Sequence, residues 1–441
     1  MKQILLIGAG LSTGSLISYL LKNADAHDWH IRIGDQELDI INKKINGHPR
    51  AEGFILDVNN QEQLYDEVQK ADMVISMLPA RFHYLVAEAC VALGKNMATA
   101  SYATPEIKKL DEKAKEKGVA IMMELGVDPG IDHMSAMQII DNIKEQGGKI
   151  TLFKSFTGGL VAPKYDNNPW NYKFTWNPRN VVVAGQGVSQ FIRNGRYKYI
   201  PYTKLFSRTE RVFFDEVGEF EGYANRDSLS YRKIYGIDDI PTIFRGTLRR
   251  PGFCKSWNVF VQLGMTDDTY YIENLENMTY RDFINAYLPY DATMSAEEKV
   301  SKMFDLPEDS SVLYRLRWLG LFEDKKIGLI HATPAQVLQH LLEKKWALDE
   351  GDKDMLAMQH QFEYELNGET KRLKSSLVVY GSDTETAMSL TVGTPLGIAV
   401  KLLLSGEIKA QGVTIPVTKN IYEPILKELK EYGIAFNERI Y

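Results

Sequence analysis

Three glycines near the N-terminus have the spacing of a phosphate-binding turn. Gly8, Gly10 and Gly14 follow a short apolar run at 4–7 and precede an apolar helical pattern, giving G-x-G-x-x-x-G. Glycine lets the chain turn tightly and approach a pyrophosphate, which then lies at the helix N-terminus. Alone the pattern is weak, because such turns also occur in folds that bind nothing. The cofactor residues expected here are Gly8, Gly10, Leu11, Ser12, Thr13 and Gly14.

An acidic residue follows the second apolar run at the distance expected for a dinucleotide site. Asp35 lies about 20 residues beyond the glycine turn. Its carboxylate can accept hydrogen bonds from the adenosine ribose and would repel a 2′-phosphate, so the sequence predicts NAD in preference to NADP. The alternatives are that Asp35 is a solvated loop acid, or that Lys43, Lys44 or Arg50 serves a phosphate.

Proton-transferring side chains follow the later apolar runs. Tyr102, Asp128 and His133 have the chemistry of general acids and bases. Spacing alone favours a plainer interpretation, in which Asp128 caps a helix that begins at Pro129 and His133 is an ordinary first-turn residue. At this level the catalytic role stays open.

The amino-acid sequence of these segments resembles that of the saccharopine dehydrogenase family, in particular its glutamate-forming saccharopine reductases. The run ELGVDPGIDH at 124–133 resembles the family's signature stretch. Further segments match in order along the chain: Ala100-Ser101-Tyr102, 156–160, 172–176, 225–228, 245–249 and 392–395. The resemblance implies an enzyme that exchanges saccharopine for L-glutamate and 2-aminoadipate 6-semialdehyde by hydride transfer to NAD(P).

The resemblance also implies which positions contact ligands. Saccharopine has three carboxylates, and an arginine fork can hold a carboxylate bidentately. The substrate residues implied are Ser101, Tyr102, Asp128, Arg226, Thr247, Leu248 and Arg249. The further cofactor residues expected are Asp57, Val58, Thr99, Ala100, Gly126, Val127, Asp128, Pro129, Gly130, Asp132 and His133. Tyr102, Asp128 and His133 remain the catalytic candidates, and no metal site is expected.

One departure from the family pattern bears on the cofactor. Fungal members use NADP and carry a cysteine-arginine pair where this chain has Asp35-Gln36. The missing arginine strengthens the expectation of NAD. On that reasoning Asp35→Ala with Gln36→Arg would shift the preference toward NADP.

Three other functions compete with this interpretation. A carboxynorspermidine dehydrogenase-like enzyme would also form a carbon–nitrogen bond reductively, but a polyamine substrate favours acids rather than Arg226 and Arg249. A non-catalytic nicotinamide-binding sensor would be expected to lack the substrate residues. A structural protein with a vestigial glycine turn has little support.

Short apolar runs separated by helical patterns must position these residues. They lie at 4–7, 30–33, 54–58, 73–78, 97–101 and 119–125, as in a parallel sheet covered on both faces. The fold class predicted is α/β: a doubly wound Rossmann-type nucleotide domain with an inserted mixed α/β substrate domain and a small helical subdomain. The expected boundaries are 1–128 with about 390–441, 129–278 with about 349–389, and 279–348.

Local signals mark several later elements. Thr333-Pro334-Ala335-Gln336 predicts a helix start, and Asn367-Gly368 predicts a hairpin turn after strand-like alternation from His360. Residues 395–404 and 422–432 are predicted as C-terminal helices.

Composition limits the function classes. The chain has 441 residues, a net charge of −6 and 44% hydrophobic residues, so nucleic acid is an unexpected partner. Cys90 and Cys254 suggest no disulfide framework or zinc site. Neither a signal peptide nor an apolar window of about 18 residues is expected, which favours a cytoplasmic protein without membrane contact. The family resemblance implies a homodimer.

Overall fold

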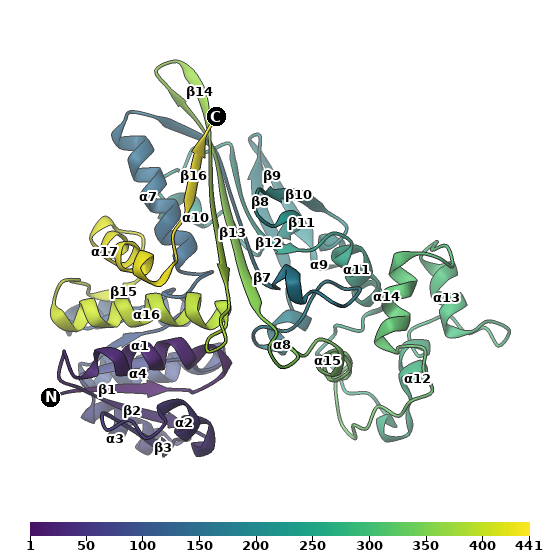
Figure 1. Cartoon of the computed structure of the whole chain (residues 1–441), viewed down its shortest axis with the longest axis horizontal. Coiled ribbons are helices and arrows are strands. Elements are labelled where there is room, and N and C mark those ends of the chain that lie inside the picture. The colour runs from purple at the N-terminus through teal and green to yellow at the C-terminus, as the bar shows by residue number, and fades with distance from the viewer. The chain divides into compact units, whose positions relative to one another are not determined.

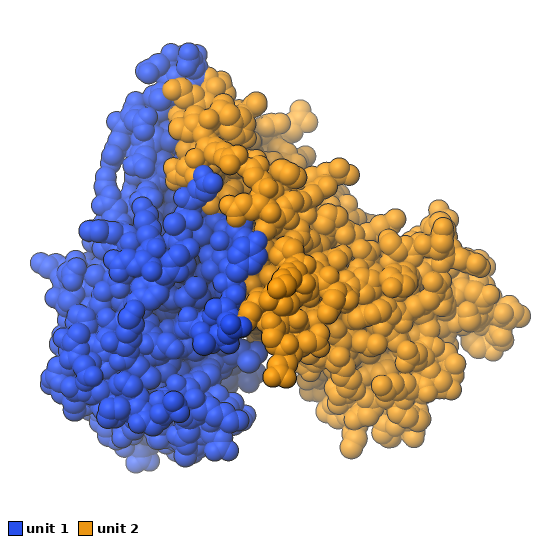
Figure 2. Space-filling model, in the orientation of Figure 1, with its two compact units in different colours: residues 1–149, 365–369, 377–437 blue, residues 150–364, 370–376, 438–441 orange.

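The computed structural model describes residues 1–441 as two compact units (Figure 2). Unit 1 comprises residues 1–149, 365–369 and 377–437, and unit 2 comprises residues 150–364, 370–376 and 438–441. The three-part division expected from the sequence is finer than this one, and its boundaries stay a prediction.

Unit 1 contains a parallel sheet of seven strands in the order β15-β6-β5-β4-β1-β2-β3. The strands are β1 (Lys2–Ile7), β2 (Trp29–Asp35), β3 (Ala51–Ile55), β4 (Met73–Ser76), β5 (Asn96–Ala98), β6 (Ala120–Met122) and β15 (Gly412–Thr414). The order reverses between β1 and β4, and in open sheets of this kind ligands bind beyond the carboxyl ends of the strands at that point. The predicted doubly wound fold is therefore confirmed.

Helices cover both faces of this sheet. Leu5 and Ile7 pack in a core with Val68 and Val86 of α3 and α4, while the alternate residue Leu6 is fully buried on the other face. The helices of unit 1 are η1 (Leu11–Thr13), α1 (Gly14–Ala24), α2 (Leu38–Ile45), α3 (Gln61–Lys70), η2 (Ala80–Phe82), α4 (His83–Leu93), α5 (Pro105–Lys108), α6 (Asp111–Glu116), α7 (Ile131–Glu145), α16 (Ala387–Ser405), α17 (Lys419–Leu429) and η5 (Lys430–Tyr432).

Helix α16 returns from the C-terminal part of the chain to pack along α1 (Figure 1). A Cβ at Gly393 would lie 2.6 Å from the backbone nitrogen of Leu16, so only glycine permits this approach. The Ser389 hydroxyl accepts a hydrogen bond from the backbone N–H of Ser15 at 3.0 Å. The segment 392–395, one of the family-like motifs, therefore fixes the helix that follows the glycine turn.

Helix α16 also corrects two sequence expectations. It begins at Ala387, capped by Thr386, and contains Pro395 in its interior rather than at its start. By length and composition alone it could cross a membrane, although 72% of its most apolar window is buried inside the protein. The expectation that no such apolar window exists was wrong, because the small residues within the helix obscure its length.

Unit 2 is built on a mixed sheet with the strand order β10-β11-β12-β7-β13-β14-β16, extended by β8 and β9 from β12. Strands β7 and β12 are parallel, whereas β11 and β12 are antiparallel. The strands are β7 (Lys149–Val161), β8 (Val188–Arg193), β9 (Arg196–Pro201), β10 (Thr209–Phe214), β11 (Gly218–Ala224), β12 (Thr242–Arg249), β13 (Asp354–Leu366), β14 (Glu369–Tyr380) and β16 (Asn437–Ile440). The β13–β14 turn places Asn367 and Gly368 at positive φ, as the sequence predicted.

Short helices complete unit 2, and four of them, α12 to α15, lie in the range 279–348 that the sequence predicts to be helical. The helices are η3 (Pro163–Tyr165), α8 (Pro178–Val182), α9 (Tyr202–Leu205), α10 (Tyr231–Ile234), α11 (Phe253–Leu263), η4 (Leu275–Asn277), α12 (Tyr280–Asn285), α13 (Ala296–Met303), α14 (Ser311–Leu319) and α15 (Pro334–Lys345). The predicted capping box of α15 is present, with Thr333 and Gln336 each accepting from the other's backbone N–H.

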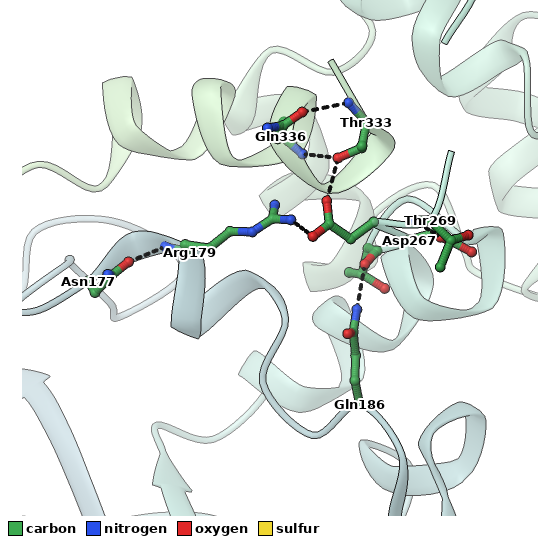
Figure 3. A network of polar contacts seen from close by, with 9 residues as sticks. Asn177, Arg179, Gln186, Asp267, Thr269, Thr333 and Gln336 are labelled. Atoms are coloured by element: carbon green, nitrogen blue, oxygen red, sulfur yellow. Dashed lines mark hydrogen bonds and ion pairs between the residues drawn. The ribbon is translucent and has the colours of Figure 1, made fainter. Parts of the chain in front are cut away.

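A polar network joins this capping box to the rest of unit 2 (Figure 3). The hydroxyl of Thr333 donates to Asp268 at 2.7 Å, and the other carboxylate oxygen of Asp268 forms an ion pair with Arg179 of α8. Asn177 caps α8 by accepting from the Arg179 backbone N–H. The network thereby fixes the start of α15 against the segment that follows the family-like run at 172–176.

Candidate functional site

The glycine turn has the shape that a pyrophosphate needs. Gly8 has a φ of 99°, and a Cβ there would lie 2.7 Å from the carbonyl oxygen of Met77, so β1 and the end of β4 approach closely. A Cβ at Gly10 would meet nothing within 4 Å, which leaves open space above the turn. No side chain caps the first helical N–H groups after Gly10. The turn therefore fits the phosphates of a dinucleotide.

Asp35 is engaged with this turn rather than projecting from it. Its Oδ2 accepts a hydrogen bond from Ala9 N at 2.6 Å, and its Oδ1 accepts from Glu37 N at 3.2 Å. Lys44 of α2 reaches the same turn, where its Nζ donates to Ala9 O at 2.7 Å. The carboxylate beside the glycine turn therefore has a cation close to it.

Tyr102 and Asp128 lie together at the carboxyl edge of the sheet. The Tyr102 hydroxyl donates to Asp128 Oδ1 at 3.1 Å. The predicted helix cap at Asp128 is wrong: α7 begins at Ile131 with Gly130 as its cap, and the Asp128–Pro129 peptide bond is cis. Because its carboxylate does not cap a helix, Asp128 can serve the chemistry of the site.

The loop after β6 folds back on itself and creates this arrangement. Gly126 N donates to Pro129 O at 3.0 Å, and Asp132 N donates to Val127 O at 3.0 Å. Asp132 Oδ1 accepts from Gly130 N at 2.6 Å. Gly130 has a φ of 146°, and a Cβ there would overlap the backbone of Gly126. Glycine at 130 is thus required by the loop itself.

A buried pair, Glu124 and His133, supports this loop from beneath. The imidazole of His133 is fully buried, and its Nε2 lies 2.7 Å from Glu124 Oε2. Glu124 Oε1 accepts from Ala103 N at 3.0 Å, and Glu124 N donates to Ser101 O at 3.0 Å. Because its ring is fully buried and lies against the carboxylates of Glu124 and Asp132, we assign His133 a positioning role. The pair ties the segment containing Tyr102 to the first turn of α7.

The other cofactor residues expected at strand ends occupy varied positions. Thr99 is buried, and its hydroxyl accepts from Ser101 N at 3.3 Å. A Cβ placed at Gly126 would lie 3.0 Å from the Cβ of Ala100, so the loop after β5 contacts the loop after β6. Asp57 is exposed after β3 and accepts from Asn59 N at 3.0 Å, whereas Val58 beside it is buried. Of the pair after β3, only the Asp57 side chain is accessible.

In unit 2, Arg249 occupies a cage of aromatic rings. Only 3% of its surface is exposed, and its guanidinium carbon lies 5.0, 5.7 and 5.3 Å from the ring centroids of Tyr172, Tyr223 and Phe253. Burial acts to lower the pKa of Arg249, but the two tyrosines and nearby acidic groups raise it above its usual value. The guanidinium therefore stays charged, which agrees with cation–π stabilisation.

Several polar atoms around Arg249 are buried without hydrogen-bond partners. Arg249 donates through Nη1 to Leu248 O at 2.8 Å, yet its Nε has no partner. The hydroxyls of Tyr172, whose ring lies against Arg249, and of Thr157 on β7 likewise have no hydrogen-bond partner. Thr157 is the register partner of Thr247 on the neighbouring strand. Unpartnered buried donors are costly, so this region fits a ligand with several carboxylate oxygens.

The remaining expected substrate residues lie on the same strands. Thr247 is half-buried and Leu248 is fully buried on β12. Arg226 follows β11, is exposed and has a φ of 47°. Asn225 N donates to Arg245 O at 2.8 Å, which fixes the start of the Arg226 loop against β12. Unit 2 thus places one exposed arginine in the loop after β11 and one enclosed arginine at the end of the adjacent strand β12.

Sequence reasoning assigned no role to Glu124 and did not single out Lys44 from its basic neighbours. Glu124 stands first in the signature run, but its contact with His133 depends on a fold-back that the spacing does not reveal. The signal that could have identified it is an acid at the end of a fully apolar strand. No group of three or more His, Cys, Asp or Glu side chains is arranged to hold a metal ion.

Comparisons with known proteins cover the whole chain. Residues 4–122 match the model of the saccharopine dehydrogenase NADP binding domain, and residues 126–434 match the saccharopine dehydrogenase C-terminal domain. A relative from Pyricularia oryzae, named saccharopine dehydrogenase [NADP(+), L-glutamate-forming], is 33% identical over 100% of this chain and 99% of its own. The mouse protein named alpha-aminoadipic semialdehyde synthase, mitochondrial, is 35% identical, and the alignment spans 47% of its length.

A solved structure agrees with these relatives. Apo saccharopine dehydrogenase (L-Glu forming) from Saccharomyces cerevisiae superposes with a TM-score of 0.89 at 31% identity, covering 100% of both chains. The present chain therefore corresponds to the full length of the fungal proteins and to about half of the mouse protein.

The expectation of NAD in preference to NADP was wrong. The matching family model is an NADP binding domain, and fungal relatives are named NADP(+)-dependent. The inference weighed the charge of Asp35 alone. In the structure that carboxylate is occupied by the Ala9 and Glu37 N–H groups and has Lys44 nearby, so it is not an isolated anion.

Proposed function

Because the chain belongs to the saccharopine dehydrogenase family, we propose that it is an NADP-dependent, glutamate-forming saccharopine dehydrogenase. The reaction converts saccharopine, water and NADP⁺ to L-glutamate, 2-aminoadipate 6-semialdehyde, NADPH and a proton, and it is reversible. The observation that carries the proposal is the end-to-end structural correspondence to the yeast enzyme, with a TM-score of 0.89 over both complete chains.

The chemistry begins at the carbon–nitrogen bond on the aminoadipate side of saccharopine. When bound, NADP⁺ would supply the acceptor for the hydride that leaves the carbon of this bond. Water would then open the resulting substrate imine. The glycine turn and the loop 126–133 would hold the dinucleotide. The protein must also orient the secondary amine and remove its proton.

Tyr102 and Asp128 suit the proton-transfer step. Their side chains form a hydrogen-bonded pair 3.1 Å apart, so a proton on one can be accepted by the other. In the proposed mechanism the pair takes the amine proton as the imine forms, then assists the attack of water. Glu124 and His133 do not contact substrate and act by fixing the segment that carries Tyr102.

The substrate carboxylates would be held by unit 2. Arg249 offers an unpartnered Nε in an aromatic enclosure, and Arg226 is an exposed residue in the loop after β11. Thr247 of the same unit adds a hydroxyl donor. Two arginines match a substrate with several carboxylates, whereas a carboxylated polyamine would favour acidic partners.

Turnover with a substrate panel tests the proposal. Purified protein is mixed with NADP⁺ and either saccharopine or carboxynorspermidine, and NADPH is followed by absorbance. We expect NADPH to form with saccharopine alone. Formation with carboxynorspermidine alone would assign the enzyme to the polyamine reaction, and nucleotide binding without any turnover would favour a sensor.

The same proposal includes a homodimer working in the cytoplasm, with the three-part domain organisation expected from the sequence. Light scattering of the purified protein tests the dimer, which a monomeric mass at micromolar concentration would contradict. Limited proteolysis tests the boundaries near residues 278 and 348, which lie in loops with exposed residues and where cleavage is expected if the helical part folds separately.

A further inference from the structure

Three basic residues follow β2, and the structure separates their roles. Arg50 is held by Asp25 and Asp28 at 2.8 and 3.0 Å. Lys43 is exposed in the last turn of α2. Lys44, its neighbour, is half-buried and extends to the glycine turn. Lys44 is therefore the one of the three that reaches the cofactor-binding turn.

The Lys44 ammonium is anchored by three oxygen atoms of that turn. Nζ donates to Ala9 O at 2.7 Å, to Gly10 O at 2.5 Å and to Thr13 Oγ1 at 2.8 Å. These atoms lie between the end of β1 and the start of α1. The charge is thus held where the first phosphate and the adjoining ribose of a dinucleotide are bound in this fold.

Asp35 defines the ribose side of the same place. The acid at the end of β2 is the group that meets the ribose 2′-hydroxyl in dinucleotide-binding folds. Here Asp35 accepts a hydrogen bond from Ala9 N, and Lys44 donates one to Ala9 O. Both charged side chains are therefore hydrogen-bonded to the backbone of the same residue. Lys44 and Asp35 attract each other electrostatically, so the negative charge of the carboxylate is partly offset where a phosphate would approach.

We propose that Lys44 is the residue that makes NADP acceptable to this chain, by offsetting Asp35 and attracting the 2′-phosphate of the cofactor. The ammonium has three donors, so it can exchange one turn oxygen for a phosphate oxygen and stay anchored by the other two. Lys44 of α2 would then bind the 2′-phosphate, the role expected of an arginine directly after β2. The inference rests on the proposed NADP-dependent function.

Nucleotide binding tests the inference without any need for turnover. Calorimetry gives dissociation constants of NADP⁺ and NAD⁺ for wild type, Lys44→Met and the control Lys43→Met, which removes an exposed charge from the same helix end. A charge-assisted hydrogen bond contributes about 1.5–3 kcal/mol, equivalent to about 10- to 150-fold in affinity. We expect Lys44→Met to weaken NADP⁺ at least about tenfold more than NAD⁺, and Lys43→Met to leave the ratio unchanged.

Two further comparisons show whether Lys44 distinguishes NADP⁺ from NAD⁺ or only holds the turn in shape. Lys44→Arg is expected to retain most of the NADP⁺ preference because it retains the charge. Equal weakening of both nucleotides by Lys44→Met would overturn the inference and reduce Lys44 to a clamp of the turn. Failure of saccharopine turnover in the wild type, with the NADP⁺ preference still lost in Lys44→Met, would instead overturn the proposed substrate and leave this inference standing.

Discussion

Unit 1 should lose stability on mild acidification through one buried histidine. His83, the first residue of α4, is 3% exposed, and its Nδ1 lies 2.8 Å from the Ser76 hydroxyl at the end of β4. Burial lowers the pKa of His83 from 6.5 to about 4. As pH falls below 6.5 the unfolded chain binds a proton that the folded chain does not, so the free energy of unfolding decreases until the pH reaches about 4.

The size of this effect follows from the two pKa values. A shift of about 2.5 pH units at 1.36 kcal/mol per unit gives about 3.4 kcal/mol in total. Between pH 7 and pH 5 about 2 kcal/mol of that stabilisation is lost, since the unfolded imidazole is almost fully protonated at pH 5 while the folded one is still mostly neutral.

Urea unfolding at the two pH values measures the effect, followed by amide hydrogen exchange in peptides from β4 and α4. We compare wild type with His83→Gln, which cannot titrate, and with His27→Gln at an exposed position. His83→Gln should reduce the pH-dependent loss by about 2 kcal/mol, and His27→Gln should not. A pH dependence that is the same in His83→Gln and wild type would refute the reasoning.

Other substitutions probe the site and its scaffold. Tyr102→Phe and Asp128→Asn should each lower kcat about 100-fold with little change in the NADP⁺ dissociation constant; steady-state kinetics with wild-type rates would remove the pair from the mechanism. Arg249→Lys keeps the charge but loses the planar fork, so KM for saccharopine should rise at least about tenfold, and an unchanged KM would place the carboxylates elsewhere. Gly393→Ala should destabilise the protein by about 1–3 kcal/mol in urea unfolding, because its Cβ would lie 2.6 Å from Leu16 N. Helix propensity alone predicts a gain of about 1 kcal/mol, so stabilisation would contradict the packing argument.

The nucleotide fold was predictable because its signals are local. Continuous apolar runs located the strands of the parallel sheet, and the glycine turn fell between β1 and α1 as expected. The third strand was displaced: β3 spans Ala51–Ile55 rather than 54–58. As an edge strand it is only partly buried, so its apolar residues do not mark its limits, and Leu56 and Val58 are buried in the loop that follows.

The site was predictable by residue type but not by geometry. Tyr102 and Asp128 were identified, yet their hydrogen bond depends on the fold-back of residues 126–130. His133 had the right chemistry for catalysis but is enclosed with Glu124. The cofactor error has the same origin, because the charge of Asp35 was visible in the sequence while the approach of Lys44 from α2 was not.

Product identification tests the central claim most directly. Saccharopine and NADP⁺ are incubated with the protein. The products are separated, and their amounts are compared with the amount of NADPH formed. The proposed function predicts L-glutamate in a one-to-one ratio with NADPH, together with the semialdehyde. Lysine and 2-oxoglutarate as products, or no consumption of saccharopine, would contradict it.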